Sequence, residues 1–234
     1  MTSTKTDRLQ HFGIKLFSGI SPESTDLLAE GAKHVPFQMG QTVVAAGQKY
    51  PGLICVLSGQ LKYARANRSG KEQVFEIADQ GDTLGYEGIA SNHAIDHDVA
   101  GRKNGEYLLV HYSNVRKAME RDPVLALNVV REAGASLTRM RKLADALSLK
   151  DANERLAAWL VTWIESSRKE TPDEPFQAVL PFTQSEIAAQ VGTVREVISR
   201  GFTRMEREGL LTVSGKRIRI LSLDGLRKYS SATA

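Results

Sequence analysis

The stretch from Leu180 to Ile220 constrains the fold more than any other part of the chain. Thr183 is followed three residues later by Glu186, which is the spacing of a capping box. This pair predicts a short helix over Gln184–Gln190, with apolar residues on one face. The stretch therefore opens with a helix whose start is set by its own side chains.

A glycine and a second helix are expected directly after it. Gly192 interrupts the apolar pattern, Thr193 can cap a helix from about Val194 to Glu208, and Gly209 can end that helix. Apolar residues recur at helical spacing along it: Val197, Ile198, Phe202 and Met205. Two short helices joined by a tight glycine turn form the helix-turn-helix pattern.

Two alternating segments after the second helix predict a small hairpin, or wing. Leu210–Val213 and Arg217–Leu221 read as strands on either side of Ser214-Gly215-Lys216. Arg can donate two hydrogen bonds to guanine, and Glu can accept one from cytosine. The polar residues of the second helix and of its neighbours are therefore candidate DNA contacts: Arg195, Glu196, Ser199, Arg200, Thr183, Ser185 and Lys216. The alternative is a solvated amphipathic helix, but cap, glycine turn, polar face and wing occur here together and in order.

The charge of the chain agrees with a DNA-binding C-terminal part. Residues 181–234 carry nine Lys or Arg and five Asp or Glu, so the whole net charge of +4 lies there. The length of 234 residues exceeds one typical domain. No apolar run is long enough to span a membrane, and the N-terminal residues lack a signal-peptide core. The single cysteine, Cys55, favours a reducing cytoplasm.

Short β-like runs punctuated by glycine fill the region from Val35 to Tyr112. The predicted strands are Val43–Val44, Leu53–Leu57, Gln60–Ala64, Gln73–Ile77 and Tyr107–His111. Many short strands at close spacing indicate a small antiparallel barrel or jelly roll, preceded by a short helix that begins at Ser21-Pro22-Glu23. The fold class is therefore α+β.

Turn residues recur at particular places in this region: Gly40, Gly47, Val56-Leu57-Ser58-Gly59, Gly70, Gly81-Asp82 and Gly85. With these features the run resembles the cyclic-nucleotide-binding barrel of the CRP/FNR family of bacterial transcription regulators. Together with the winged helix-turn-helix, the resemblance covers about residues 12–228 in the family's domain order. It implies three parts: an effector barrel over 1–121, a dimerisation helix over 122–149 and a DNA-binding domain over 150–234.

Apolar residues between the two parts follow alternating steps of four and three from Ala126 onward. Such an a/d seam predicts a coiled coil between two copies of the helix, although it could instead pack on its own barrel. The seam residues are Val130, Ala133, Leu137, Met140, Ala144 and Leu147. A hinge is expected at Lys150-Asp151, followed by a helix over about Asn153–Ser166 and a surface loop over Ser167–Pro175.

The resemblance also locates an effector pocket, which departs from the pattern of members that bind cyclic AMP. Those members use a Gly-Glu pair for the ribose. Here Gly85 and Gly88 are retained, but the Glu position falls at Tyr86, and Glu87 stands one place further on.

The phosphate-binding pair of those members, Arg-Ser, falls near Asp96 and His97. A carboxylate at this place repels a phosphate. The adenine-contacting hydroxyl pair on the central helix aligns with Met140 and Arg141. Binding of cyclic AMP in the usual way is therefore not expected.

Other effectors stay open, and the cofactor is unknown. An iron–sulfur cluster needs several thiolates, which one cysteine cannot supply. Cys55 lies among apolar residues and is expected to be a buried small hydrophobe. A haem-based gas sensor is the alternative within the family, because histidines could serve as axial ligands: His11, His34, His93, His97 and His111.

Two other function classes compete with that of a DNA-binding regulator. The sequence has no P-loop, nucleophile elbow or HExxH motif, and no metal-binding His/Cys cluster, so an enzyme is not expected. A ligand-binding regulatory subunit without a DNA role would share the barrel but not the charged second helix and wing. The prediction is a cytoplasmic homodimer that binds double-stranded DNA, contacts RNA polymerase and responds to a small-molecule effector other than cyclic AMP, or to none.

The resemblance extends to the DNA sequence that the second helix would read. Glu196 and Arg200 stand where the family reads its half-sites, Arg195 is similar to the cyclic-AMP branch, and Ser199 before Arg200 is similar to the FNR branch. An inverted repeat with a TG-rich half-site such as TGTGA or TTGAT is therefore expected.

Overall fold

The structure is a computed structural model that describes residues 13–91, 93–167 and 176–231. The chain forms two compact units, one of residues 1–65 and 74–140 and the other of residues 66–73 and 141–234, so that one boundary falls within a long helix between Met140 and Arg141. No helix among the described residues is long and apolar enough to cross a membrane. The predicted surface loop Ser167–Pro175 and His11 lie almost entirely outside the described residues.

The N-terminal unit is built on a six-stranded sheet with the strand order β1-β6-β3-β4, in which β2 also pairs with β6 and β5 with β3. Its described pairings are antiparallel. The strands are β1 (Lys33–Phe37), β2 (Thr42–Val44), β3 (Leu53–Ala66), β4 (Glu72–Ala78), β5 (Thr83–Leu84) and β6 (Asp98–Val110).

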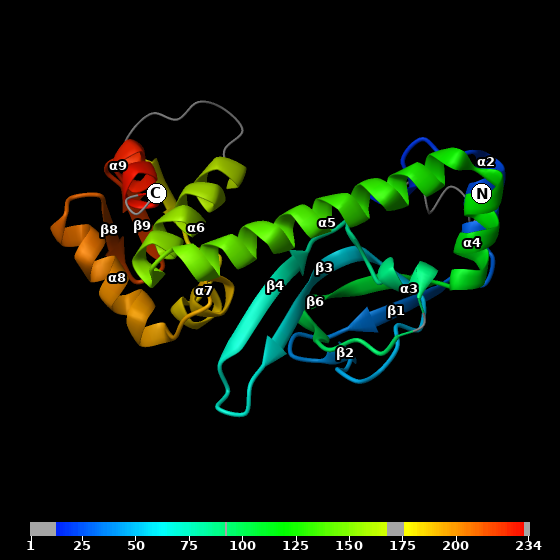
Figure 1. The fold of residues 1–234 in the computed structure, drawn as a ribbon, viewed down its shortest axis with the longest axis horizontal. Coiled ribbons are helices and arrows are strands. Elements are labelled where there is room, and N and C mark those ends of the chain that lie inside the picture. The colour runs from blue at the N-terminus through cyan, green and yellow to red at the C-terminus, as the bar shows by residue number, and fades with distance from the viewer. Residues whose placement is uncertain (1–12, 92, 168–175, 232–234) are drawn as a thin grey trace. The chain divides into compact units, whose positions relative to one another are not determined.

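Helices flank this sheet in the first half of the chain (Figure 1). Ser21 caps α2 through its side chain and a proline follows at the first helical position, as the sequence predicts. The elements are the 3-10 helix η1 (Lys15–Phe17), α2 (Pro22–Ala29), α3 (Glu87–Ala90), α4 (Tyr112–Arg121) and the first part of α5 (Pro123–Leu149).

Strand β3 corrects the sequence prediction, which placed two separate strands on either side of Ser58-Gly59. They form one strand of 14 residues, whose register with β6 shifts next to Ser58. At this irregularity the backbones come so close that a β-carbon on Gly59 would lie 2.3 Å from the carbonyl oxygen of Asn104. The glycine therefore bends one long strand and does not separate two strands, so that β3 continues from Leu53 to Ala66.

Two clusters of buried apolar residues fill the unit. One joins η1, α2 and α4 to the sheet and contains Cys55, Leu108 and Leu125. The other fills the barrel around Ile54, Leu61 and Val99. Cys55 has no exposed surface, so the prediction of a buried small hydrophobe is confirmed.

Polar contacts from side chains hold α5 to the barrel. Asn128 donates hydrogen bonds to the carbonyl oxygens of Leu16 and Ser18, at 3.0 and 2.9 Å. Arg139 forms an ion pair with Glu76 of β4, at 3.0 Å. One side of α5 therefore contacts the barrel of its own chain.

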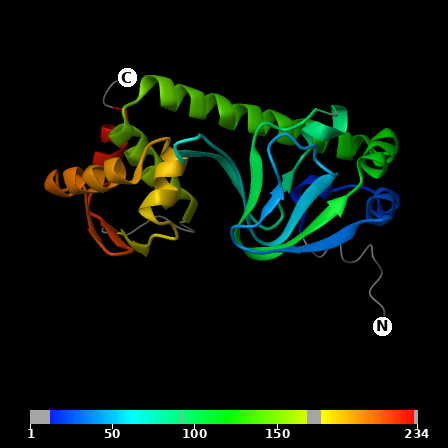
Figure 2. The same cartoon turned by 90° about the horizontal axis from the view of Figure 1, so that it is seen from below.

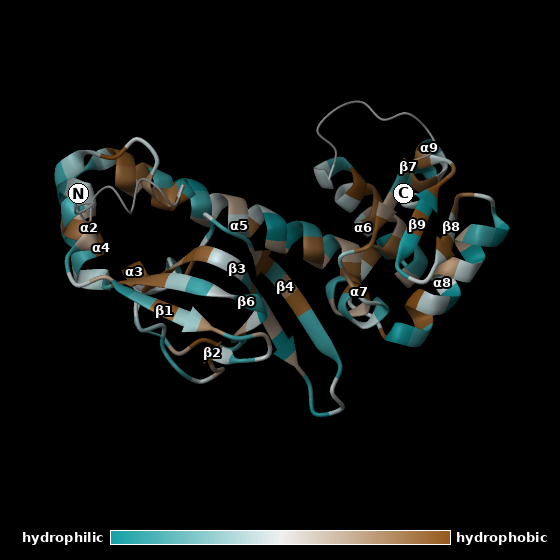
Figure 3. Ribbon diagram, turned by 180° about the vertical axis from the view of Figure 1, so that it is seen from behind, coloured by the Kyte–Doolittle hydropathy of each residue, from teal (hydrophilic) through white to brown (hydrophobic). Residues whose placement is uncertain are grey.

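The side of α5 away from these contacts exposes apolar residues: Leu127 is 48% exposed, Val130 65% and Leu137 71%. Ala133 and Ala144 are also exposed. Hydrophobic and hydrophilic residues alternate along the helix (Figure 3). Met140, however, is half-buried, so the exposed line passes through Leu127 and does not follow every seam position that the heptad spacing gave.

The C-terminal unit is a helix-turn-helix with a three-stranded sheet in the order β7-β9-β8 (Figure 2). Its elements are α6 (Ala152–Ser167), β7 (Phe176–Val179), α7 (Gln184–Val191), α8 (Arg195–Arg207), β8 (Leu211–Ser214), β9 (Arg217–Ile220) and α9 (Leu223–Tyr229). The break between α5 and α6 falls at Lys150 and Asp151, where a hinge was expected. The sequence analysis did not predict β7 and α9.

Candidate nucleic-acid interface and effector pocket

The start of α7 is fixed by the predicted capping box. The Thr183 hydroxyl accepts a hydrogen bond from the Glu186 amide at 3.2 Å, and the Glu186 carboxylate accepts one from the Thr183 amide at 2.8 Å. Gly192 ends the helix with φ at +77°, a left-handed conformation that favours glycine. The hydroxyl cap expected at Thr193 is wrong, because α8 begins after Val194 and no side chain caps it.

Helix α8 divides into an apolar face and a polar face. Ile198, Phe202 and Met205 are buried against α6, α7 and the sheet. The opposite face is exposed and carries the four predicted base-reading residues: Arg195, Glu196, Ser199 and Arg200. In the part of the chain that the structure describes, neither Arg195 nor Arg200 forms an ion pair, so both guanidinium groups are available to an anion or a base edge.

A hollow of about 460 Å³ brings the start of α7, the start of α8 and the turn of the wing together. Thr183, Ser185, Arg195 and Lys216 line it. These residues come from α7, α8 and the turn of the wing, and they surround the N-terminus of α7, where free backbone amides favour a phosphate. Glu196, Ser199 and Arg200 do not line the hollow and lie further along the exposed face of α8.

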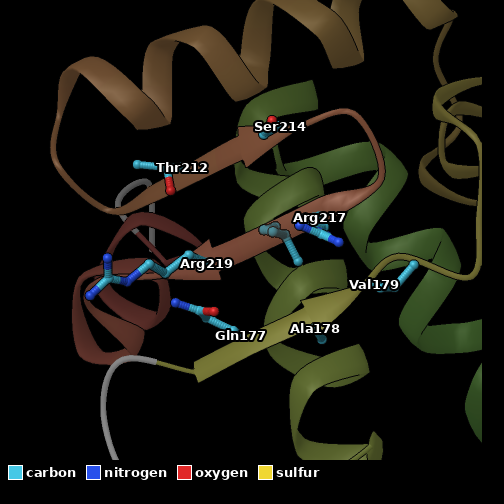
Figure 4. Close-up of a pocket in the computed structure, with 8 residues that line it drawn as sticks. Gln177, Ala178, Val179, Thr212, Ser214, Arg217 and Arg219 are labelled. Atoms are coloured by element: carbon cyan, nitrogen blue, oxygen red, sulfur yellow. The ribbon is translucent and has the colours of Figure 1, made fainter.

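The sheet of this unit has its own groove, of about 350 Å³, on the face away from the core (Figure 4). Arg217 and Arg219 of β9 lie on that face, with Val179 and Gln177 of β7 on one side. Its described lining contains no carboxylate. The sequence analysis missed this second basic surface, because the alternation along β9 does not show which strand lies beside it.

Comparison with protein-family models gives two matches that follow the order of the two units. The cyclic nucleotide-binding domain matches residues 34–122, and the Crp-like helix-turn-helix domain matches residues 154–229. The chain belongs to the CRP/FNR family of transcription regulators. Members of the CRP/FNR family regulate transcription and are not enzymes.

Individual relatives agree with the CRP/FNR assignment. The chain is 27% identical over 198 residues to the fumarate and nitrate reduction regulatory protein of Escherichia coli K12, covering 85% of this chain and 78% of that protein. A CooA mutant from Carboxydothermus hydrogenoformans has a TM-score of 0.74 at 21% identity, over 86% of this chain and 89% of that one. FixK2 from Bradyrhizobium japonicum has a TM-score of 0.71 at 20% identity, over 87% and 99%.

The barrel of this CRP/FNR protein contains a cavity of about 240 Å³. Of the predicted pocket residues, Glu87, Asp96 and His97 line it, together with Gly88. Gly85 is not among the described lining residues, but its carbonyl oxygen accepts a hydrogen bond at 2.6 Å from Tyr112, which is one of them.

The other predicted pocket residues lie elsewhere. Tyr86 forms a side-chain hydrogen bond with Ser136 of α5. Met140 and Arg141 are not among the described lining residues. The cavity is instead completed by Tyr50, Tyr63 and Tyr112, which sequence reasoning missed because they come from three separate segments.

His97 lies in the wall of the cavity and is only 3% exposed. Its Nδ1 is 3.3 Å from a carboxylate oxygen of Asp96, and its Nε2 is 3.1 Å from the hydroxyl of Tyr50. Burial lowers the pKa of His97, against the opposing effect of Asp96. A neutral ring with Nδ1 protonated satisfies both contacts, so both nitrogens are engaged and neither is free to hold a haem iron.

Glu87 is the second titratable group of the cavity. Desolvation beside the cavity raises the pKa of its carboxyl group, although the residue as a whole is exposed. In turn, this carboxylate helps burial to raise the pKa of Tyr50, Tyr63 and Tyr112. One carboxylate therefore lies close to three phenols, an arrangement that repels a phosphate.

The remaining titratable groups give no site for a metal or for thiol chemistry in the described part of the chain. Burial raises the pKa of the Cys55 thiol to about 12, so it stays protonated at neutral pH. No cluster of metal-ligating side chains occurs among the described residues. His34, His93 and His111 are exposed.

Proposed function

We propose that this protein is a homodimeric regulator that binds an inverted repeat in double-stranded DNA through α8 and the wing. Its barrel controls that binding in response to an effector other than cyclic AMP. The observation that carries the proposal is the polar face of α8, whose two arginines are exposed beside the hollow that Thr183, Ser185 and Lys216 share.

The chemistry of this surface divides into positioning and reading. The N-terminus of α7 and the side chain of Lys216 suit backbone phosphates, which fix the position of the protein on the duplex. Arg195, Glu196 and Arg200 suit base edges in the major groove, because an arginine can bond guanine twice and a glutamate can accept from cytosine.

The exposed apolar line on α5 supports the homodimer. Leu127, Val130 and Leu137 would each lose solvent contact if two copies of the helix paired, and this burial favours association. Small residues on the same side, Ala133 and Gly134, let the two backbones approach. To enter successive major grooves of an inverted repeat, the two α8 helices of such a dimer would need to stand roughly 34 Å apart.

The lining of the barrel cavity supports an effector other than cyclic AMP. Asp96 and Glu87 place carboxylates where a phosphate would need cations, and the adenine-contacting positions on α5 are Met140 and Arg141. The barrel retains its link to α5 through Tyr86 and Ser136. A ligand that binds one arrangement of this link better than another shifts the population between active and inactive dimers.

The protein would act in the cytoplasm, where promoters and RNA polymerase are found. The polymerase is the expected protein partner of the DNA-bound dimer. Whether the dimer activates or represses follows from the position of its site relative to the promoter.

Selection of binding sites from random duplex DNA by the purified full chain tests the proposal. We expect an inverted repeat with a TG-rich half-site such as TGTGA or TTGAT, with half-site centres about one helical turn apart. Enrichment of single, unrepeated sites would contradict the dimer, and no enrichment would contradict the DNA-reading role.

A thermal melt with 1 mM cyclic AMP tests the effector part. A ligand with a dissociation constant of 10 μM would add roughly 2.7 kcal/mol to stability at that concentration. We expect no shift in melting temperature and no change in DNA affinity. A clear upward shift would show that the cavity still binds the nucleotide.

A further inference from the structure

The cavity in the barrel has the size and the walls of a site for a small molecule. Its volume of about 240 Å³ is below the range of about 300–1,000 Å³ that drug-sized ligands occupy. Three tyrosines and His97 form much of its wall, and all come from the N-terminal unit. The rings of Tyr63 and His97 pack edge to face with centroids 3.6 Å apart. A ligand in this cavity would therefore be compact and would contact aromatic side chains.

Two tyrosine hydroxyl groups in the wall already donate hydrogen bonds to other groups of the protein. Tyr112 donates its hydroxyl proton to the carbonyl oxygen of Gly85, at 2.6 Å. Asp96 is next to the protonated Nδ1 of His97, so Nε2 is left as an acceptor for the hydroxyl proton of Tyr50. Both hydroxyl oxygens can therefore only accept a hydrogen bond from a ligand. At Tyr50 and Tyr112 the wall thus accepts hydrogen bonds.

The charges around the cavity point in the same direction. Asp96 forms an ion pair with Arg65 at 3.2 Å, between two exposed side chains, and buried His97 is neutral. Lys49 contributes a cation to the same lining, and both Lys49 and Glu87 are exposed residues. Glu87 has no side-chain partner within the described ranges, and it is the carboxylate that all three tyrosines sense. Glu87 thus places a carboxylate beside the aromatic rings, and Lys49 is a cation of the same lining with which a positively charged ligand would compete.

We propose that this cavity binds a small organic ammonium ion, with Glu87 as its counter-ion and the tyrosine rings as its walls. An ammonium group gains from the negative faces of aromatic rings, and more so where water is excluded. If it carries protons, it can also donate charge-assisted hydrogen bonds to the carboxylate and to the phenol oxygens. The proposal rests on the proposed function only for its regulatory meaning, since binding itself needs no DNA.

The position of Glu87 connects the cavity with helix α5. Glu87 is the first residue of α3, and Tyr86 directly before it bonds Ser136 of α5. Neutralising Glu87 therefore changes the electrostatics one residue away from the link between barrel and helix. An ammonium ligand would act on the same element that carries the exposed apolar line.

Choline and its uncharged carbon isostere, 3,3-dimethyl-1-butanol, test the proposal on the full-length protein. We expect choline chloride to raise the melting temperature and to change tyrosine fluorescence, compared with sodium chloride at equal ionic strength. The isostere has the same shape without the charge and should do neither. Ethanolamine tests a primary ammonium, and binding by either ammonium compound supports the class.

Variants identify the groups involved. Glu87→Gln keeps the shape and removes the charge, and should weaken ammonium binding at least tenfold; Glu120→Gln, on exposed α4, is the matched control and should not. Lys49→Gln removes the cation at the rim, so it should bind choline at least as tightly as the unchanged protein.

Three results would overturn the proposal: equal binding of the uncharged isostere, undiminished binding by Glu87→Gln, or no binding of either ammonium compound. Selection of DNA sites in the absence of ligand distinguishes failure of the cavity proposal from failure of the proposed DNA-binding function. Selected inverted repeats with no ammonium binding reject only the cavity proposal, whereas ammonium binding with no selected site rejects only the DNA-reading role.

Discussion

The two units of this regulator assemble their candidate sites in different ways. The C-terminal surface comes from neighbouring residues of a short stretch, because the capping box, the glycine turn and α8 follow one another directly. The barrel cavity instead joins Tyr50, Tyr63 and Tyr112 with the segment from Glu87 to His97. A site of the first kind can be read from spacing, whereas one of the second kind depends on how distant strands pair. The following predictions test this difference.

The largest effect is expected from Leu137→Glu. Leu137 is 71% exposed near the middle of α5, so a charge there is tolerated in a single chain. In a paired helix it would place two like charges in a desolvated seam, costing roughly 3 kcal/mol or more. Sedimentation should show monomers, and affinity for an inverted repeat should fall because the two half-sites lose their shared frame.

Ala135→Glu is the control, since it adds the same charge at an exposed position about 160° around the helix from Leu137. It should remain a dimer. If the Leu137 variant stays dimeric as well, the interface does not lie on this side of α5.

Arg200→Ala should cost about 1–3 kcal/mol on the selected DNA site, because a bidentate contact to guanine would be lost. Preference should relax at one base pair in each half-site. Arg207→Ala, on the last turn of the same helix, is the control and should leave that preference intact. Equal losses on selected and random DNA would show that Arg200 holds a phosphate and does not read a base.

Thr183→Ala removes one half of the capping box and should destabilise the C-terminal unit by about 1 kcal/mol. Urea denaturation followed by tryptophan fluorescence measures this directly, because Trp159 and Trp163 both lie in α6 of that unit. Thr183→Ser keeps the hydroxyl and should restore most of the stability. A Ser variant as unstable as the Ala variant would assign the loss to the methyl group.

The smallest effect concerns the pH dependence of the N-terminal unit. The pKa of His97 is lowered in the folded protein, so its contribution to stability is present above the ordinary value of 6.5 and is lost as the pH falls below it. The effect is expected to be small, because Asp96 partly offsets the influence of burial on the pKa of the ring. Melting at pH 7.5 and 5.5 should therefore depend on pH less in His97→Gln than in the unchanged protein, whereas His93→Gln, at an exposed position, should behave like the unchanged protein.

Much of the architecture could be predicted from the sequence. The capping box at Thr183, the turn at Gly192 and the break at Lys150 are local signals, and the structure has all three. The two strands predicted around Gly59 failed for a non-local reason, because the close approach of Asn104 turns a strand break into a bend.

The heptad spacing on α5 likewise could not predict which face of the helix is exposed. Spacing alone cannot decide which of two adjacent stripes faces outward. In the structure the barrel takes the stripe that includes Asn128, and Met140 is half-buried as well. The exposed line therefore runs through Leu127, which the heptad pattern did not include. The cavity tyrosines were missed for the same reason, since no local pattern relates residues from a loop, a strand and a helix.

The adjacency of Tyr86 and Glu87 has a consequence for how this protein should be measured. One of these residues bonds α5 and the other faces the cavity, so pairing of α5 and occupation of the cavity act on a single short helix. Linkage is reciprocal: a ligand that tightens the dimer must itself be held more tightly by the dimer. Its apparent affinity then depends on protein concentration, and titrations above and below the dimer dissociation constant would give two different values for one chemically identical cavity.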